Sequence, residues 1–191
     1  MSLCACGKSG ELKFPLTPRF LCSECYGKEF ERKFLNNIPR KIRGHSIAVA
    51  FSGGKDSSSV LYILEKYRKK LKIPFIAAMI VDDENPEVQG ARNKIVDLSK
   101  HKYPSVKFIQ RSFSDFYNFS LPDLVYQSDK KKMGFTPCTI CGILRRHAII
   151  TLSLELKVDY VIMGNTLNDE ASTILLNILR GKHERNFRDV I

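Results

Sequence analysis

The clearest chemical signal in the sequence lies between residues 48 and 59, where an apolar run leads into Ser52-Gly53-Gly54-Lys55-Asp56-Ser57. Gly53 and Gly54 can adopt positive φ and let backbone N–H groups approach an anion without an intervening Cβ. A helix beginning near Ser57 would point its free N–H groups at the same anion. Lys55 adds a mobile positive charge. These residues predict a cradle for the phosphate groups of a nucleotide.

The glycine spacing excludes two common kinds of phosphate-binding loop. The stretch lacks the Gly-x-x-x-x-Gly-Lys-Ser/Thr of a Walker A loop and the Gly-x-Gly-x-x-Gly of a dinucleotide-binding fold. Phosphate would repel Asp56 unless its carboxylate holds a cation or a backbone N–H group, so it is either a ligand of Mg²⁺ or a helix N-cap. The alternative for the whole stretch is a glycine turn that only joins a strand to a helix.

Carboxylates also follow the second apolar run, in Asp82-Asp83-Glu84. They could meet a ribose or Mg²⁺, but a solvated acidic turn is the interpretation that we favour. We expect the backbone near Ile80, just before them, to line an adenine pocket.

A third segment, residues 163–171, follows the last apolar run. Gly164 allows a close approach to a ligand, while Asp169 and Glu170 supply the carboxylates that a magnesium nucleotide needs. The alternative is that Asn168 or Asp169 only caps the following helix.

The six cysteines form three close pairs, and no secretory signal is visible, so metal binding is favoured over disulfides. The first two pairs have close to the spacing of a zinc ribbon, although the first pair is tighter than the usual Cys-x-x-Cys. They offer four thiolates for a closed tetrahedral site: Cys4, Cys6, Cys22 and Cys25. Zinc would fold a segment too short to bury a core of its own. Free thiols or a disulfide are the alternatives.

The third pair, Cys138 and Cys141, lies at the start of an expected helix beside the basic residues 145–147. A helix N-terminus and nearby cations both stabilise thiolates. Two thiolates alone complete neither a zinc site nor a four-cysteine cluster. The pair is therefore a redox disulfide, a persulfide-forming thiol, or part of a cluster with a further ligand that is exogenous or lies beyond residue 191. Inert buried cysteines are the remaining alternative.

Strand and helix patterns alternate from residue 46 onward. The expected strands are residues 46–52, 75–81, 105–110 and 160–163, and the expected helices are residues 56–70, 86–100, 141–156 and 167–179. Residues 113–127 are aromatic and irregular and receive no assignment. This alternation predicts an α/β fold with an open parallel sheet and the glycine loop at the carboxyl end of the first strand. Residues 1–36, with a helix over residues 29–35, form a zinc-ribbon module, and residues 37–191 form the nucleotide-binding domain.

The composition adds two expectations. Lysine and arginine outnumber aspartate and glutamate, which gives a net charge of +11 and favours a polyanionic partner. The basic run at residues 68–72 is interpreted instead as a solvated helix face. The chain is 43% hydrophobic but has no apolar run near the length of a membrane span, so no membrane association is expected.

With these residues in hand, the sequence resembles the tRNA 2-thiolation branch of the PP-loop (N-type ATP pyrophosphatase) family. The resemblance rests on the N-terminal cysteine module, residues 52–57, Pro-Cys-x-x-Cys at residues 137–141, and residues 164–171 continuing to Gly181. It implies an adenine nucleotide alpha hydrolase-like fold and a cytoplasmic enzyme that adenylates a pyrimidine carbonyl oxygen of tRNA with ATP, releases pyrophosphate and replaces the oxygen with sulfur.

The resemblance also implies roles for residues and partners. Nucleotide-binding roles fall on Ala50, Ser52, Gly53, Gly54, Lys55, Asp56, Ser57, Ile80, Arg145, Gly164 and Asp169. Cys138 and Cys141, with a third and later cysteine, would hold a [4Fe-4S] cluster and act with Asp56 in catalysis. The implied cofactors are ATP, Mg²⁺, Zn²⁺ and that cluster; the implied partners are tRNA, a sulfur donor such as a ubiquitin-like sulfur carrier protein, and a second copy in a homodimer.

The chain departs from the family pattern where a histidine and an aspartate are replaced by Asn165 and Asn168, and where the third cluster cysteine is missing. We therefore expect either the N-terminal part of a longer enzyme or a diverged member. Two other functions stay open: another adenylating PP-loop enzyme, of the amidotransferase or lysidine-forming type, and a non-catalytic zinc-containing protein that binds RNA or a partner.

Overall fold

The computed structural model describes residues 3–15, 17–132 and 134–181. The chain divides into two compact units, Met1–Ile42 and Arg43–Ile191. The sequence placed this division after residue 36. Each unit is described by itself.

The first unit is a small module with very little apolar core. Strands β1 (Leu12–Lys13) and β2 (Phe20–Leu21) pair antiparallel and are followed by helix α1 (Ser23–Asn37) and the 3₁₀ turn η1 (Arg40–Ile42). Its buried cluster consists of two apolar side chains and two cysteines: Phe14, Leu21, Cys4 and Cys22. Because so little apolar surface is buried, the cysteines must supply much of the stability of this unit. Helix α1 starts six residues before the expected helix, directly after Cys22.

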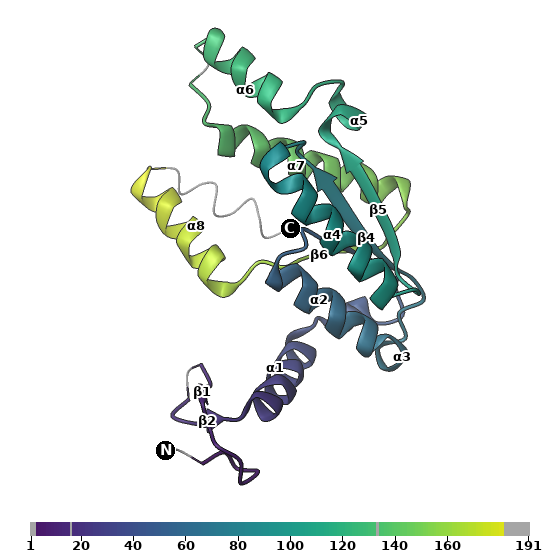
Figure 1. Ribbon diagram of the computed structural model, residues 1–191, viewed down its shortest axis with the longest axis vertical. Helices are drawn as coiled ribbons and strands as arrows, with labels where there is room; N and C mark the ends of the chain where they lie inside the picture. The colour runs from purple at the N-terminus through teal and green to yellow at the C-terminus, as the bar shows by residue number, and fades with distance from the viewer. Residues whose placement is uncertain (1–2, 16, 133, 182–191) are drawn as a thin grey trace. The chain divides into compact units, whose positions relative to one another are not determined.

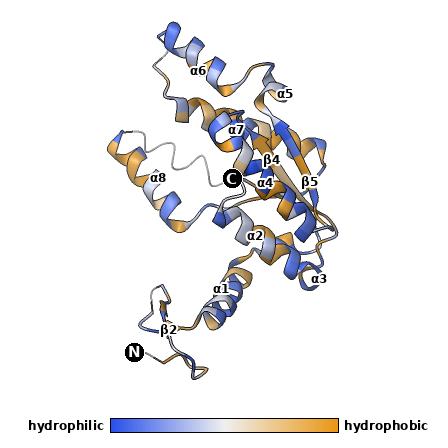
Figure 2. Ribbon diagram, viewed as in Figure 1, coloured by the Kyte–Doolittle hydropathy of each residue, from blue (hydrophilic) through white to orange (hydrophobic). Residues whose placement is uncertain are grey.

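The second unit is built on a four-stranded parallel sheet. Its strands are β3 (Ile47–Ala50), β4 (Ile76–Asp82), β5 (Lys107–Ser112) and β6 (Tyr160–Met163), in the order β5-β4-β3-β6. Figure 1 shows helices packed around these strands, and Figure 2 shows β4 as a mainly hydrophobic strand. Every residue of β4 is buried, as its apolar run predicted. The expected α/β parallel fold is confirmed.

Seven helices are described in this unit. They are α2 (Lys55–Lys66), α3 (Arg68–Leu71), α4 (Pro86–Lys102), α5 (Phe113–Tyr117), α6 (Leu121–Lys130), α7 (Pro137–Glu155) and α8 (Leu167–Leu179). The helix expected over residues 56–70 is interrupted at Tyr67, where φ −103° and ψ 11° leave the helical region. Helix α7 starts at Pro137 instead of Cys141, because Thr136 caps it and proline suits the first turn.

Packing of α7 against the sheet fixes the position of its first half. Ile149 and Leu152 of α7 belong to the buried cluster that contains Met79 and Val81 of β4. Arg145 lies one helical turn before Ile149 and is thereby carried to the end of β4 where Asp82 and Asp83 follow.

Helix α8 has a different environment. None of its residues is buried, and Leu175, Ile178 and Leu179 are more than half exposed. Its apolar residues stand out along the helix in Figure 2. No helix among the described residues is both long enough and apolar enough to cross a membrane.

Candidate nucleotide site and cysteine centres

The glycine loop joins β3 to α2 as expected, but its two glycines differ. Gly53 has φ 81°, a left-handed conformation that favours glycine, and a Cβ there would lie 3.0 Å from Cγ2 of Ile95. Gly54 has φ −70° and ψ 165° and is the N-cap of α2. The positive φ that glycine permits is therefore adopted by Gly53 and not by Gly54, whose extended backbone is the ordinary conformation of a residue that starts a helix.

Hydrogen bonds inside the loop hold its shape. The buried Ser57 accepts a hydrogen bond from the backbone N–H of Ser52 (3.3 Å), and its Oγ lies 3.2 Å from the carbonyl oxygen of Gly54, to which it donates. Ser57 therefore shapes the cradle from within, and the backbone N–H groups at the start of α2 remain for an anion.

Lys55 and Asp56 form an ion pair at the start of α2. Nζ of Lys55 lies 2.8 Å from Oδ1 of Asp56, and Lys55 is 85% exposed. The hydrogen bond and the charge of Asp56 raise the pKa of Lys55. Because Gly54 is the N-cap, the alternative role of Asp56 as a helix cap is not observed.

The loop after β6 packs directly on the glycine loop. A Cβ on Gly164 would lie 2.7 Å from the backbone nitrogen of Ser57 and 3.0 Å from its Cα. A side chain cannot be accommodated against backbone atoms at this distance. Gly164 thus lets two loops from distant parts of the sequence meet at one sheet edge.

These loops enclose a cavity at the carboxyl ends of β3, β4 and β6. It is lined by eight of the residues for which the sequence predicted nucleotide contacts: Ala50, Ser52, Gly54, Asp56, Ser57, Ile80, Arg145 and Gly164. Gly53, Lys55 and Asp169 are not part of its lining. Phe51, Met163 and Asn165, which also line the cavity, lie in the two segments that the sequence singled out. The sequence did not identify Met79, Val81, Arg92 and Ile149 as lining residues. Their only signal was their position in or beside the apolar strands and helices.

Asp169 acts as a helix cap. Its Oδ2 accepts hydrogen bonds from the backbone N–H of Thr166 (2.8 Å) and from the Thr166 hydroxyl (2.7 Å), while the Asp169 N–H donates to the same hydroxyl. These bonds from Thr166, with a smaller effect of Lys55, hold the pKa of Asp169 below its ordinary value. The capping alternative that the sequence left open is therefore observed, in the form of a capping box with Thr166 as N-cap. A nucleotide contact of Asp169 stays a prediction.

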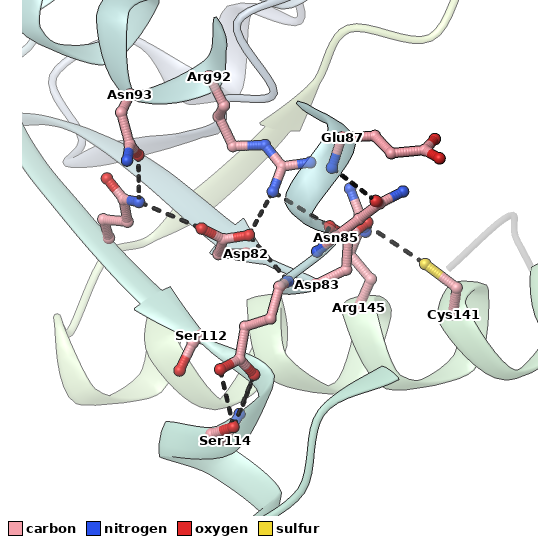
Figure 3. Close-up of polar contacts among 12 residues, drawn as sticks. Asp82, Asp83, Asn85, Glu87, Arg92, Asn93, Ser112, Ser114, Cys141 and Arg145 are labelled. Carbon is pink, nitrogen blue, oxygen red and sulfur yellow. Dashed lines mark hydrogen bonds and ion pairs between the residues drawn. The ribbon is translucent and has the colours of Figure 1, made fainter. Parts of the chain in front are cut away.

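The acidic end of β4 differs from the solvated turn that the sequence favoured. Asp82 is only 3% exposed, and its Oδ1 lies 2.5 Å from Nη1 of Arg92. Asp83 contacts Arg92 (3.1 Å) and Arg145 (2.6 Å). Figure 3 shows both arginines converging on the two carboxylates. The solvated-turn interpretation was wrong because the two arginine partners lie far away in the sequence, and buried carboxylates require such partners.

The third acidic residue, Glu84, has another role. It adopts φ 60°, and its carboxylate accepts hydrogen bonds from the backbone N–H and the hydroxyl of Ser114 at the start of α5. Glu84 therefore ties the end of β4 to α5. Burial opposes ionisation of the neighbouring Asp83, but the charges of Arg92 and Arg145 outweigh burial and lower the pKa of Asp83.

The first two cysteine pairs come together as predicted. The four sulfur atoms of Cys4, Cys6, Cys22 and Cys25 all lie within 4.8 Å of one another. Thiolates at about 2.3 Å from a tetrahedral Zn²⁺ lie roughly 3.8 Å apart, so this cluster fits zinc. Hydrogen bonds from the backbone N–H groups of Cys6 and Cys22 lower the pKa of Cys4 to about 6. Hydrogen bonding to Cys6, Cys4 and Cys22 raises the pKa of Cys25 to about 12. A bound cation would relieve this conflict among neighbouring thiolates.

The third pair does not form a comparable cluster. Cys138 is exposed and Cys141 is half-buried in the first turns of α7. Within the described chain, no other cysteine, histidine or carboxylate joins them in a group of three or more metal ligands. A [4Fe-4S] cluster takes four thiolates or an equivalent set, so the described residues alone do not fit it.

The chain was compared with family models, with curated proteins and with solved structures. No family model matches the chain. Cytoplasmic tRNA 2-thiolation protein 1 of Drosophila pseudoobscura pseudoobscura is 30% identical over 185 residues, which cover 94% of this chain and 52% of the relative. A probable sulfurtransferase of Methanocaldococcus jannaschii is 29% identical over 196 residues, covering 99% and 55%.

A solved structure is also similar. The U34-tRNA thiolase NcsA from Methanococcus maripaludis with its [4Fe-4S] cluster has a TM-score of 0.77 and 28% identity, covering 97% of this chain and 61% of that chain. The chain spans about half the length of the curated relatives that it matches.

The parallel sheet, the Ser-Gly-Gly-Lys-Asp-Ser loop at the end of β3 and the cavity beside it are the features expected of a PP-loop fold. Over the region that it spans, the chain is similar to proteins named for tRNA thiolation.

Proposed function

We propose that the chain binds ATP in this cavity and takes part in ATP-dependent thiolation of tRNA in the cytoplasm. The reaction would adenylate a carbonyl oxygen of a pyrimidine base and replace it with sulfur. The observation that carries this proposal is that one helix, α7, brings Arg145 to the cavity wall and carries both Cys138 and Cys141 in its first turns. The relatives named as thiolation proteins and as a U34-tRNA thiolase support it.

The residues around the cavity suit the first half of such a reaction. Backbone N–H groups at the start of α2 would bind the pyrophosphate part of ATP, with Lys55 as a mobile charge beside them. Ile80, Met79 and Val81 offer an apolar wall for adenine. Asp56, which lines the cavity, would hold Mg²⁺ after exchanging its ion pair with Lys55. Adenylation converts a poor leaving group into a good one, so the protein has to orient the α-phosphate and neutralise its charge.

The metal centres divide between the two units. Zn²⁺ would occupy the cluster of Cys4, Cys6, Cys22 and Cys25 and would have a structural role, because all four tetrahedral positions are taken by protein sulfur. Cys141, which contacts the cavity-lining Arg145, and Cys138, three residues before it on α7, would supply two thiols for the sulfur chemistry. The described residues do not complete the ligand set of a [4Fe-4S] cluster.

Pyrophosphate release is the direct test of the proposal. We expect release to require both ATP and tRNA, and to fall at least tenfold in Lys55→Met, which loses the charge beside the loop. Lys69→Met, on the exposed face of α3, is the matched control and should release pyrophosphate normally. Pyrophosphate release without tRNA would contradict the proposal and favour another adenylating reaction. No release with ATP and tRNA together would also contradict it and would favour a non-catalytic RNA-binding role.

Metal analysis after anaerobic purification separates the sulfur routes. Iron and sulfide that are lost in Cys138→Ser, together with zinc that remains, would indicate a cluster completed from outside the described residues. Zinc without iron, with thiolation still lost in Cys138→Ser, would indicate persulfide chemistry at this pair. Thiolation that survives replacement of both Cys138 and Cys141 by serine would exclude either route and favour another adenylating reaction.

A further inference from the structure

Arg145 connects the cavity to the second cysteine of α7. Its Nη2 lies 2.6 Å from Oδ2 of Asp83 and 3.4 Å from Sγ of Cys141, and its side chain also lines the cavity. Figure 3 shows Arg145 between the end of β4 and the Cys141 side chain. Both contacts use one terminal nitrogen. Among the described residues, no hydrogen bond is made by Nε or Nη1, so these donors remain for a ligand in the cavity.

Asp83 is itself held in place before it meets Arg145. Its other oxygen, Oδ1, lies 3.1 Å from Nη1 of Arg92, and the same nitrogen lies 2.5 Å from the buried Asp82. The Arg92 side chain is only 12% exposed, so this part of the cluster is enclosed. Asp83 therefore presents Oδ2 at a fixed position at the end of β4.

Arg145 needs such a fixed acceptor. Its side chain is 31% exposed, and a long arginine side chain at the surface has many rotamers available. Cys141 is a weak acceptor and would not by itself select one rotamer. A charged hydrogen bond to Asp83 does, because such bonds are stronger and more directional than neutral ones.

We propose that Asp83 is a positioning residue that holds Arg145 where one guanidinium group serves both an anion in the cavity and the sulfur of Cys141. The proposal rests on the proposed function only in taking that anion to be a nucleotide phosphate. Its consequence is that the phosphate and sulfur sides of the site share one positive charge. A nucleotide phosphate bound to the free Nε and Nη1 donors would be placed next to Cys141.

Asp83 could instead only neutralise the charge of Arg145, and this explanation makes the opposite prediction for Asp83→Asn. If Asp83 only neutralises a guanidinium that α7 already holds in place, Asp83→Asn leaves more positive charge beside Cys141. If Asp83 positions Arg145, the same change releases the guanidinium and leaves less positive charge there. The local charge at Cys141 therefore distinguishes the two roles.

Charge-selective alkylation measures this local charge. Cys141 is alkylated in a Cys138→Ser background with anionic iodoacetate and with neutral iodoacetamide, and the modified peptide is quantified by mass spectrometry. The protein carries zinc, and iron is shown to be absent. Because both reagents attack the same thiolate, the ratio of their rate constants does not depend on the ionised fraction of the thiol. It reports the electrostatic preference for the anion.

We expect Arg145→Gln to lower this ratio about fivefold, the effect of a unit charge about 4 Å away in water. Asp83→Asn should come within twofold of Arg145→Gln, and Asp83→Glu should restore at least half of the loss. Asp97→Asn, on the exposed side of α4 with only a 3.5 Å contact to Lys100, is the control and should leave the ratio unchanged.

Two results would overturn the proposal: a ratio in Asp83→Asn that equals or exceeds that of the parent, or a ratio that Arg145→Gln does not change. If Asp83→Asn fails to fold in a thermal denaturation experiment, Arg92→Lys is the substitute, because it removes the contact that fixes Asp83. The ratio should then fall by at least half, and no change would count against the proposal. Alkylation requires neither tRNA nor turnover, so it can succeed or fail independently of thiolation.

Discussion

Gly164 contributes to the site because it has no Cβ. The backbone of α2 passes so close that a Cβ would lie 2.7 Å from the nitrogen of Ser57. Backbone atoms at the start of a helix cannot move aside without disturbing the N–H groups that would bind phosphate. The glycine is therefore required for packing between two loops, a reason distinct from the close ligand approach that the sequence predicted.

We expect Gly164→Ala to weaken ATP binding at least tenfold and to destabilise the fold by about 1–3 kcal/mol, since overpacking displaces the glycine loop. Titration calorimetry and thermal denaturation measure the two effects. The matched control is Gly142→Ala in α7, where nothing lies within 4 Å of the added Cβ. This change should leave ATP binding intact and stabilise the helix by about 0.5–1 kcal/mol. Equal ATP affinity in Gly164→Ala would contradict the packing argument.

Asp159 makes the stability of the second unit depend on pH. It lies at the end of the sheet opposite the cavity. Its Oδ2 accepts hydrogen bonds from the hydroxyl of Ser46 (2.6 Å) and from its backbone N–H (2.8 Å), which joins the starts of β3 and β6. The hydroxyl and then the backbone bond hold the pKa of Asp159 below its ordinary value, with a smaller effect of His45. The stabilisation is therefore fully present above the unfolded pKa of about 4 and is lost as pH falls through the lower folded value.

We expect the stability difference between the native chain and Asp159→Asn to be largest near neutral pH and to shrink below about pH 4. Urea denaturation at several pH values measures the difference. Asp97→Asn, which removes an exposed carboxylate with one long contact, is the control for the loss of a carboxylate. A difference that grows on acidification would have the wrong sign for a lowered pKa.

At the scale of whole elements, strands and long helices were predictable and the segments between them were not. The bounds of β6 and α8 agree with the prediction, because each is a continuous apolar or periodic run. Residues 113–127 were left unassigned, although α5 and α6 each begin with a capping box, Ser112 with Asp115 and Ser120 with Asp123. The Ser-x-x-Asp pattern that marks both helix starts is present in the sequence, but the aromatic residues that follow show no helical period.

Helix α8 is the element with the least support from packing. It has 13 residues, none of them buried, and helices of this length are marginal in water without tertiary contacts. The capping box of Thr166 and Asp169 is its main local support.

We expect the backbone N–H groups of α8 to exchange with solvent at least a hundredfold faster than those of the buried strand β4, because exchange from an unpacked helix needs only local opening. Hydrogen exchange followed by mass spectrometry measures both segments in one sample. Equal protection of α8 and β4 would show that α8 is covered by something outside the described contacts.

At the scale of the whole molecule, the two units have separate reasons to fold. The second unit buries an apolar core around β4, while the first buries Phe14 and Leu21 beside its cysteines. The sequence predicted the parallel sheet, the glycine loop and the cysteine cluster, because apolar runs, glycine spacing and cysteine spacing are local. It could not predict the contacts of Asp83 with Arg92 and Arg145. Only the folded chain brings the residue after β4 together with residues of α4 and α7.

We expect one zinc per chain, and we expect its removal to unfold the first unit alone. Structural zinc contributes on the order of 10–16 kcal/mol in such modules, far more than two buried apolar side chains provide. Cys22→Ser or a strong chelator should abolish the protection of α1 from hydrogen exchange. ATP binding and the thermal transition of the second unit should remain. Retention of α1 protection from hydrogen exchange in the metal-free protein would contradict this expectation.

The place of β6 at the margin of the sheet has a practical consequence for handling the protein. Among the described strands β6 pairs only with β3, so it is an edge strand of the described sheet, and Val161 and Met163 are exposed on it. The net charge of +11 keeps molecules apart in dilute buffer, and salt screens that repulsion. Colloidal stability should therefore decline as salt is added, so a buffer chosen to weaken adventitious RNA binding will also favour edge-to-edge aggregation.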